Sequence, residues 1–163
     1  MCIRDRYRDG KFASKVFNAK DGQLQSDNVQ FVLQDSARRV WIGTDKGLYC
    51  WKDNVLQCAD KSHSFQRACS FKGKTCFITV DGEIRTADKE GRLSLAAKLP
   101  DVSYGLDLPG NLAVGSQWVI FTSEGSFVFD TESNMLKPSP SEWNIPGGEV
   151  SVDNRGNYWV HNK

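Results

Sequence analysis

Short apolar runs separated by polar turns fill most of this chain. The clearest runs are VWI at 40–42 and WVIF at 118–121, and both are rich in β-branched and aromatic residues. Because their apolar side chains are consecutive and do not alternate with polar ones, these runs predict short strands that are buried on both faces of a sheet. No segment sustains apolar residues at i, i+3, i+4 and i+7, the spacing of one helix face. The pattern therefore predicts an all-β fold.

A four-residue turn that begins with threonine and ends with glycine follows three of the predicted strands. Its copies are TDKG at 44–47, TVDG at 79–82 and TSEG at 122–125, so the glycines lie 35 and then 43 residues apart. Glycine suits the last position because it adopts positive φ angles at little cost. The recurrence predicts repeated units that each contain the same hairpin turn.

The most complete unit is the sixteen-residue stretch QDSARRVWIGTDKGLY at 34–49. It contains an aspartate turn, a strand, the glycine hairpin and the start of a return strand. Gly43 interrupts a wall of larger side chains in this strand, which indicates that a ring or another backbone segment comes close there.

A partial copy, DNRGNYW at 153–159, repeats the internal spacing of residues 35–41. Trp41 and Trp159 take matching strand positions, and both are expected to be packing residues. Arg38 stands where the copy has glycine, so we expect a positive φ there, at a cost of about 1 kcal/mol or more.

Repeats of about 40 residues with roughly four short strands each are typical of β-propeller blades. One blade is a small twisted sheet that cannot bury both of its faces alone, so blades stack against one another. We expect a β-propeller fragment of about four blades, each a four-stranded antiparallel sheet, from a larger propeller of about seven blades. A β-solenoid is the main alternative, but its repeats are usually shorter.

The expected divisions of the chain follow the repeat. They are a non-native or disordered leader at 1–6, the end of a preceding blade with a connector at 7–25, blades at 26–60, 61–98 and 99–145, and an incomplete blade at 146–163.

Both ends of the sequence resemble cut ends. The opening residues MCIRDR resemble leftover adaptor sequence and have no apolar core of the kind that a signal peptide contains. The last residues stop where the earlier copies make their glycine turn. We therefore expect a piece of a longer protein, with a closed four-bladed ring, completed by pairing strands from the two ends, as the alternative.

The unit from LQSDNV at 24–29 to GLY at 47–49 resembles the repeat of two-component regulator propellers, whose characteristic parts include an aspartate turn and a WIGT strand. The copy at 153–159 matches the central part of that repeat. The other two units match only in their turns, with Cys76 and Val119 where Trp41 stands in the first unit.

The resemblance implies a role as well as a fold. Such propellers form the periplasmic input region of membrane-bound hybrid histidine kinases and are associated with sensing oligosaccharides. By this resemblance the segment is a non-catalytic ligand sensor, its partners are the remaining blades and an oligosaccharide ligand, and the parent protein is a homodimer.

Net charge and the length of the apolar runs exclude some classes of partner. The formal net charge is +1 with 25% charged residues, so neither nucleic acid nor an anionic membrane surface is an expected partner. No apolar run approaches the roughly 18 residues that span a bilayer, so no membrane contact by this segment is expected.

The five cysteines do not identify a compartment. Their number is odd and no CxxC spacing occurs, so a zinc site is not expected, and whether any of them pair stays open. Cys50 and Cys76 fall in predicted strands, where cysteine usually acts as a small apolar residue.

Little in the sequence indicates catalysis. His63 and His161 have no second ligand at metal spacing, no G-x-S-x-G motif occurs, and no cofactor or metal is expected. Tyr104 and Trp143 lie in loop-like stretches and are the candidates for stacking on a sugar ring. The alternatives to a sensor are a propeller lyase or hydrolase with its active site in other blades, and a protein-interaction scaffold.

Overall fold

The computed structural model describes residues 2–8, 11–71, 73–100, 110–123, 125–141, 149–152 and 158–161. The elements whose bounds are given below are all β-strands, which confirms the all-β prediction. The strands form three four-stranded sheets and two two-stranded sheets, and all pairings are antiparallel.

Each four-stranded sheet is a meander in which consecutive strands pair. The first sheet contains β3 (Val29–Gln34), β4 (Val40–Thr44), β5 (Gly47–Lys52) and β6 (Val55–Asp60). The second sheet contains β7 (Phe65–Phe71), β8 (Lys74–Thr79), β9 (Glu83–Ala87) and β10 (Leu93–Lys98). The third sheet contains β11 (Gly110–Val114), β12 (Gln117–Thr122), β13 (Gly125–Asp130) and β14 (Met135–Pro138). The two-stranded sheets are β1 (Cys2–Arg8) with β2 (Lys11–Phe17), and β15 (Glu149–Val152) with β16 (Tyr158–His161).

The structure of the N-terminal residues differs from the prediction. Residues 1–6 are expected to be non-native or disordered, whereas in the structure Cys2–Arg8 form β1, which pairs with β2 from Cys2 opposite Phe17 to Arg8 opposite Lys11. The expected disorder is therefore not what the structure shows. Strand pairing uses backbone groups that every residue carries, so a polar sequence can join it without an apolar pattern.

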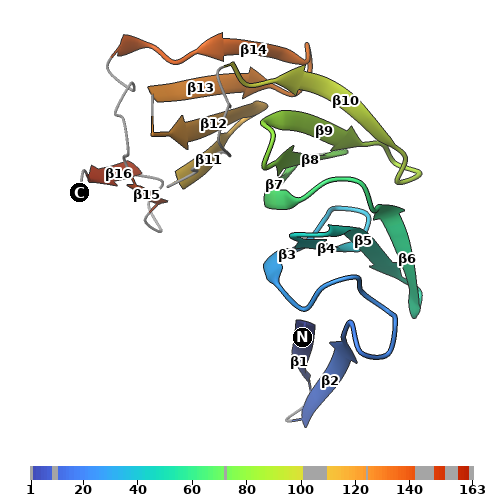
Figure 1. The fold of residues 1–163 in the computed structure, drawn as a ribbon. Coiled ribbons are helices and arrows are strands. Elements are labelled where there is room, and N and C mark those ends of the chain that lie inside the picture. The colour runs from blue at the N-terminus through green and yellow to red at the C-terminus, as the bar shows by residue number, and fades with distance from the viewer. Residues whose placement is uncertain are drawn as a thin grey trace.

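The sheets follow one another along a curved row, with β1–β2 at one end and β15–β16 at the other (Figure 1). Strands β3, β7 and β11 lie on the inner side of the curve, and β6, β10 and β14 lie on the outer side. This radial order of meandering sheets is the architecture of β-propeller blades, as the repeat predicts.

The core lies between neighbouring sheets. Trp41 of β4 is fully buried, and its ring meets the Phe77 ring of β8 edge to face, with 4.9 Å between the centroids. Val40 and Ile42, on the opposite face of β4, pack against Phe17. The strand is therefore buried on both faces, as its run of consecutive apolar residues predicts.

A second apolar layer joins the second and third sheets. Cys76 and Ile78 of β8 pack with Trp118 and Ile120 of β12, and Phe129 of β13 completes this layer. Central strands therefore contribute alternate side chains to two different layers.

Trp159 does not share the burial of Trp41. It lies on β16, near one end of the row, and is 62% exposed. The expectation that both indoles pack in the interior is confirmed for Trp41 and is wrong for Trp159, because burial of this position depends on a further sheet packed over it.

Gly43 is required by the ring of Phe31. A Cβ atom built at Gly43 would lie only 2.2 Å from Cε1 of Phe31, far inside van der Waals contact. Phe31 and Gly43 are direct partners in the β3–β4 register. The predicted close approach of a ring at this glycine is therefore confirmed.

The threonine–glycine turns fall into two kinds. In the first and third sheets, Gly47 and Gly125 have φ of +147° and +152°, and each accepts a hydrogen bond at its carbonyl from the threonine hydroxyl that opens the turn. In the second sheet, Ile78 pairs with Ile84, so the loop is one residue longer. Gly82 there has φ of +77°, and the prediction of one common turn is wrong for this copy.

The aspartate turn also recurs. The N–H of Arg38 donates a hydrogen bond to the carbonyl oxygen of Asp35. The N–H of Asp35 donates to the carbonyl oxygen of Arg39, and the N–H of Arg39 donates to the carboxylate of Asp35. Residues 88–92 between β9 and β10 form the same bonds in the same order. Arg38 has φ of +60°, as predicted, and Gly91 occupies its place in the second turn with φ of +90°.

Replacement of Arg38 by glycine should therefore stabilise the fold. Relief of the left-handed φ outweighs the extra freedom that glycine gives the unfolded chain, and we expect a gain of about 0.5–1 kcal/mol. The denaturant midpoint of Arg38→Gly should rise, whereas Arg38→Ala, which removes the exposed side chain but keeps the strain, should not gain. Equal midpoints for the two variants would contradict the explanation by backbone strain.

Candidate functional site

Asp35 carries a buried carboxylate with several hydrogen-bond partners. Its Oδ2 accepts hydrogen bonds from Nε of Arg39 at 2.7 Å and from the indole N–H of Trp41 at 2.8 Å, and the Thr75 hydroxyl of the second sheet lies 3.4 Å away. Burial acts to raise the pKa of Asp35, but the Trp41 and Arg39 hydrogen bonds outweigh it and hold this pKa below its ordinary value. This carboxylate serves the fold, because its acceptor sites are taken up by groups of the chain itself.

Arg39 extends that network to the next sheet. Its Nη1 donates to the carbonyl oxygens of Asp88 and Lys89 at 2.9 and 3.1 Å, and its guanidinium lies 5.2 Å from the Trp41 ring centroid. A Cβ atom at Gly91 would lie 3.1 Å from the same Nη1, so this glycine also makes room for the guanidinium.

Two hollows flank the β9–β10 turn, on the face of the row where the aspartate turns lie. The hollow between the second and third sheets has a volume of about 460 Å³, and that between the first and second sheets about 410 Å³. Lys89 lines both of them. The larger hollow is lined by Phe71, Gly73, Lys74, Lys89, Gly115, Ser116, Thr131 and Glu132.

Lys74 is held in place at the larger hollow. Its Nζ donates to the carbonyl of Thr131 and, at 3.1 Å, to Oδ1 of Asn134, so a side chain of the second sheet is fixed to a turn of the third. Lys89 and Glu132 are exposed beside it. The hollow thus offers both signs of charge together with the Ser116 hydroxyl, a combination that can hydrogen-bond a polar, uncharged molecule.

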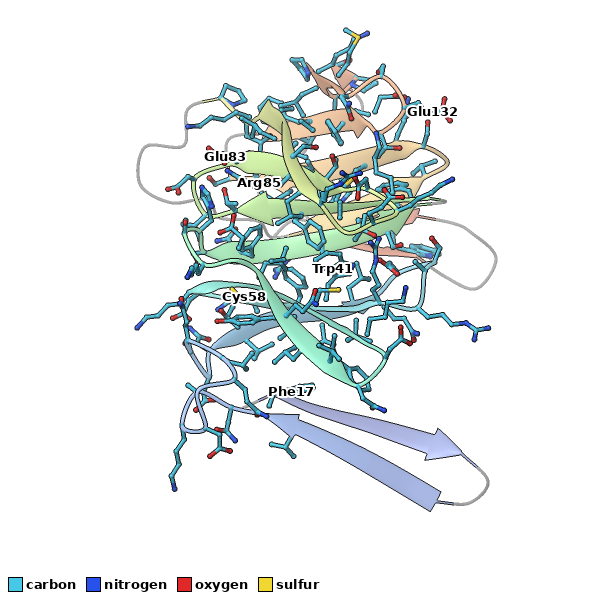
Figure 2. All side chains as sticks on the ribbon, turned by 90° about the vertical axis from the view of Figure 1, so that its right-hand side faces the viewer. Phe17, Trp41, Cys58, Glu83, Arg85 and Glu132 are labelled. Atoms are coloured by element: carbon cyan, nitrogen blue, oxygen red, sulfur yellow. The ribbon has the colours of Figure 1, made fainter. Side chains whose placement is uncertain are left out.

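A charged cluster lies at the ends of the strands opposite to the aspartate turns. It consists of Asp60 at the end of β6, His63 in the following connector, and Glu83 and Arg85 of β9. Figure 2 shows Glu83 and Arg85 at one end of the strands and Glu132 at the other.

The contacts of His63 specify one neutral tautomer. Arginine can only donate, so Nη2 of Arg85, at 3.2 Å from Nε2 of His63, requires this nitrogen to accept. The proton of a neutral ring then lies on Nδ1, where Asp60 accepts it at 3.0–3.1 Å. Both ring nitrogens are engaged by charged side chains, so this histidine is held as part of an ion network.

Asp60 anchors this cluster. Burial acts to raise its pKa, but the backbone N–H of Ser62 and the His63 ring outweigh this effect and leave the pKa below its ordinary value. The cluster ties the first sheet to the second at the end remote from the Asp35 network.

The two residues that the sequence proposes for ligand stacking, Tyr104 and Trp143, lie outside the described residues. The Asp60 cluster and the hollows were not predicted. Only the spacing of three between Asp60 and His63 could have indicated the cluster, because its other members come from a strand about twenty residues further along the chain.

In the described part of the chain, no three histidine, cysteine, aspartate or glutamate side chains meet in a way that could hold a metal ion. No helix among the same residues is long and apolar enough to cross a bilayer.

No protein-family model matches the sequence, and no curated protein matches it. Solved structures do match the fold. The extracellular domain of BT4673 from B. thetaiotaomicron, assigned to the hybrid two-component systems, is similar with a TM-score of 0.66 and 12% identity, over 92% of this chain and 22% of that domain. The corresponding domain of BT3049 from the same organism gives a TM-score of 0.67 and 19% identity, over 85% of this chain and 20% of that domain.

A third similar structure is the WD40 β-propeller domain of Doa1, with a TM-score of 0.57 and 14% identity over 81% of this chain and 47% of that one. At these identities the likeness shows the fold, which is that of a β-propeller. The chain spans about a fifth of the length of the two extracellular domains.

Replacement of Asp60 by asparagine tests the charged cluster. At neutral pH we expect a loss of about 1.5–3 kcal/mol, the range for hydrogen bonds to a charged group. Because the folded pKa of Asp60 is lowered, its stabilisation is present above the unfolded pKa and is lost as pH falls through the folded pKa. The variant should therefore lose less stability than the wild type between neutral pH and about pH 3.

Denaturant midpoints across this pH range measure the effect. Asp53→Asn is the matched control, because Asp53 is an exposed turn residue at φ of +49°, a conformation that asparagine tolerates. Identical pH profiles for the wild type and Asp60→Asn would refute the role given to this carboxylate.

Proposed function

We propose that this chain is a ligand-sensing segment of a larger β-propeller, and that the propeller is the input region of a membrane-anchored two-component regulator. The likeness to extracellular domains of two such systems, over 92% and 85% of this chain, is the observation that carries the proposal. The WIGT-type repeat supports it independently. The segment then works outside the cytoplasm, in the periplasm, with the remaining blades of its parent as neighbours.

The ligand class that the proposal assigns is an oligosaccharide. Sugar hydroxyls both donate and accept hydrogen bonds, and the hollow around Lys74 and Lys89 presents ammonium donors beside the Glu132 carboxylate and the Ser116 hydroxyl. Tyr104 and Trp143 stay the proposed stacking residues. A rigid row of sheets with exposed turns is a suitable platform for such contacts.

In this proposal the segment binds and does not catalyse. A bound ligand signals by favouring one arrangement of the parent, which we propose to be a homodimer, over another. Substitutions in the strands should then change the stability of the fold, whereas substitutions in the turns should change the affinity for the ligand.

Isothermal calorimetry on the full extracellular region of the parent tests the proposal, with candidate oligosaccharides as titrants. Lys89→Ala should weaken binding about tenfold, which corresponds to the loss of one hydrogen bond to a charged group. Lys137→Ala, an exposed lysine on β14 outside both hollows, is the matched control and should leave affinity unchanged. Turnover of the same sugars that maps to this segment would contradict the sensor role.

A further inference from the structure

Two cysteines face each other across neighbouring strands of the second sheet. Cys69 of β7 is the direct register partner of Cys76 of β8. Cys76 is fully buried, and the partly buried Cys69 packs against the same apolar cluster, so both side chains lie on one face of the sheet.

The equivalent positions of the other sheets hold large apolar pairs. The register partners there are Leu33 with Trp41 in the first sheet and Leu112 with Val119 in the third. Of the three four-stranded sheets, only the second therefore has cysteine at both of these positions. If cysteine served only as a small apolar filler, one substitution would not require the other.

The backbone geometry suits a covalent bond between these two residues. Directly opposed residues of antiparallel strands have Cα atoms about 4.5 or 5.5 Å apart, depending on the kind of pair. Both values lie within the range of roughly 4.4–6.8 Å that disulfides span. Cys50 and Cys58 have no cysteine opposite them, because Cys50 lies opposite Trp41 and Gln57, and Cys58 lies opposite Tyr49.

We propose that Cys69 and Cys76 form a cross-strand disulfide when the chain folds in the presence of a low-molecular-weight disulfide such as oxidised glutathione. The thiolate of Cys69 attacks the glutathione disulfide, forms a mixed disulfide and releases one glutathione thiol. The thiolate of Cys76 then attacks the Cys69 sulfur and releases the second. The two cysteines are oxidised and the glutathione disulfide is reduced, and the two protons lost by the protein thiols are taken up by the two glutathione thiolates that are released.

The bridge forms before the core closes. In the folded sheet, burial raises the pKa of Cys69 to about 11 and that of Cys76 to about 12, so both thiols are protonated at neutral pH and attack slowly. During folding they are still solvated. Once formed, the disulfide joins the inner strand β7 to the central strand β8 beside the layer that holds the third sheet.

Refolding of the full chain provides the test. The protein is unfolded and reduced, refolded with excess oxidised glutathione, checked for folding by tryptophan fluorescence, alkylated and digested with trypsin. Trypsin cleaves after Arg67, Lys72, Lys74 and Arg85, so the two cysteines fall in separate peptides, 68–72 and 75–85. We expect these peptides to be recovered mainly as one disulfide-linked species, which is absent from protein refolded under reducing conditions.

Matched variants identify the pair. Cys69→Ala should abolish the linked species, and the double variant Cys50→Ala with Cys58→Ala should retain it. Recovery of both peptides singly, alkylated or glutathionylated, from refolded wild-type protein would overturn the proposal. So would a link from Cys69 or Cys76 to any other cysteine.

Discussion

The structure depends on apolar contact between neighbouring sheets. A four-stranded blade presents two apolar faces to solvent when it is alone, and only another sheet can cover them. Trp41 shows this dependence directly: it is fully buried where the second sheet places Phe77 and Phe65 in the same apolar cluster. Trp159, at the matching position of β16 near one end of the row, is 62% exposed. The same side chain in the same local motif is thus a core residue or a surface residue according to whether a sheet covers it.

Polar groups then fix how the sheets meet. The Asp35 carboxylate binds its own turn, the indole N–H of Trp41 and Arg39, while Arg39 reaches the carbonyls of Asp88 and Lys89 in the next sheet. Apolar packing has little directional preference, whereas these bonds have defined lengths and angles. At the other ends of the strands, the ion pair between Asp60 and Arg85 also joins the first sheet to the second. Arg39 lines the smaller hollow and Lys74 the larger one, so residues that join neighbouring sheets also help to shape both hollows.

The sequence predicts those features whose cause is local. Arg38 takes a positive φ because its turn requires one, which the repeat predicts. Gly43 lacks a side chain because a ring fills that space, which its place in a run of larger side chains predicts; the structure identifies the ring as that of Phe31. Features whose partners come from distant residues were not anticipated. The Asp60–Arg85 cluster joins two sheets, and the extra loop residue before Gly82 becomes visible only in the strand register. The larger hollow likewise is lined by residues from the turns of four different hairpins.

A double-mutant cycle on Trp41 and Phe77 tests most directly whether contact between sheets holds this fold together. The variants Trp41→Leu and Phe77→Leu keep apolar side chains, which favours folding of all four proteins in the cycle. Denaturant unfolding should show that the two substitutions are coupled by about 0.5–1.5 kcal/mol, the range for an aromatic pair in direct contact. Costs that simply add, to within about 0.3–0.5 kcal/mol, would contradict the account, because they would mean that the two sheets do not depend on each other through these rings.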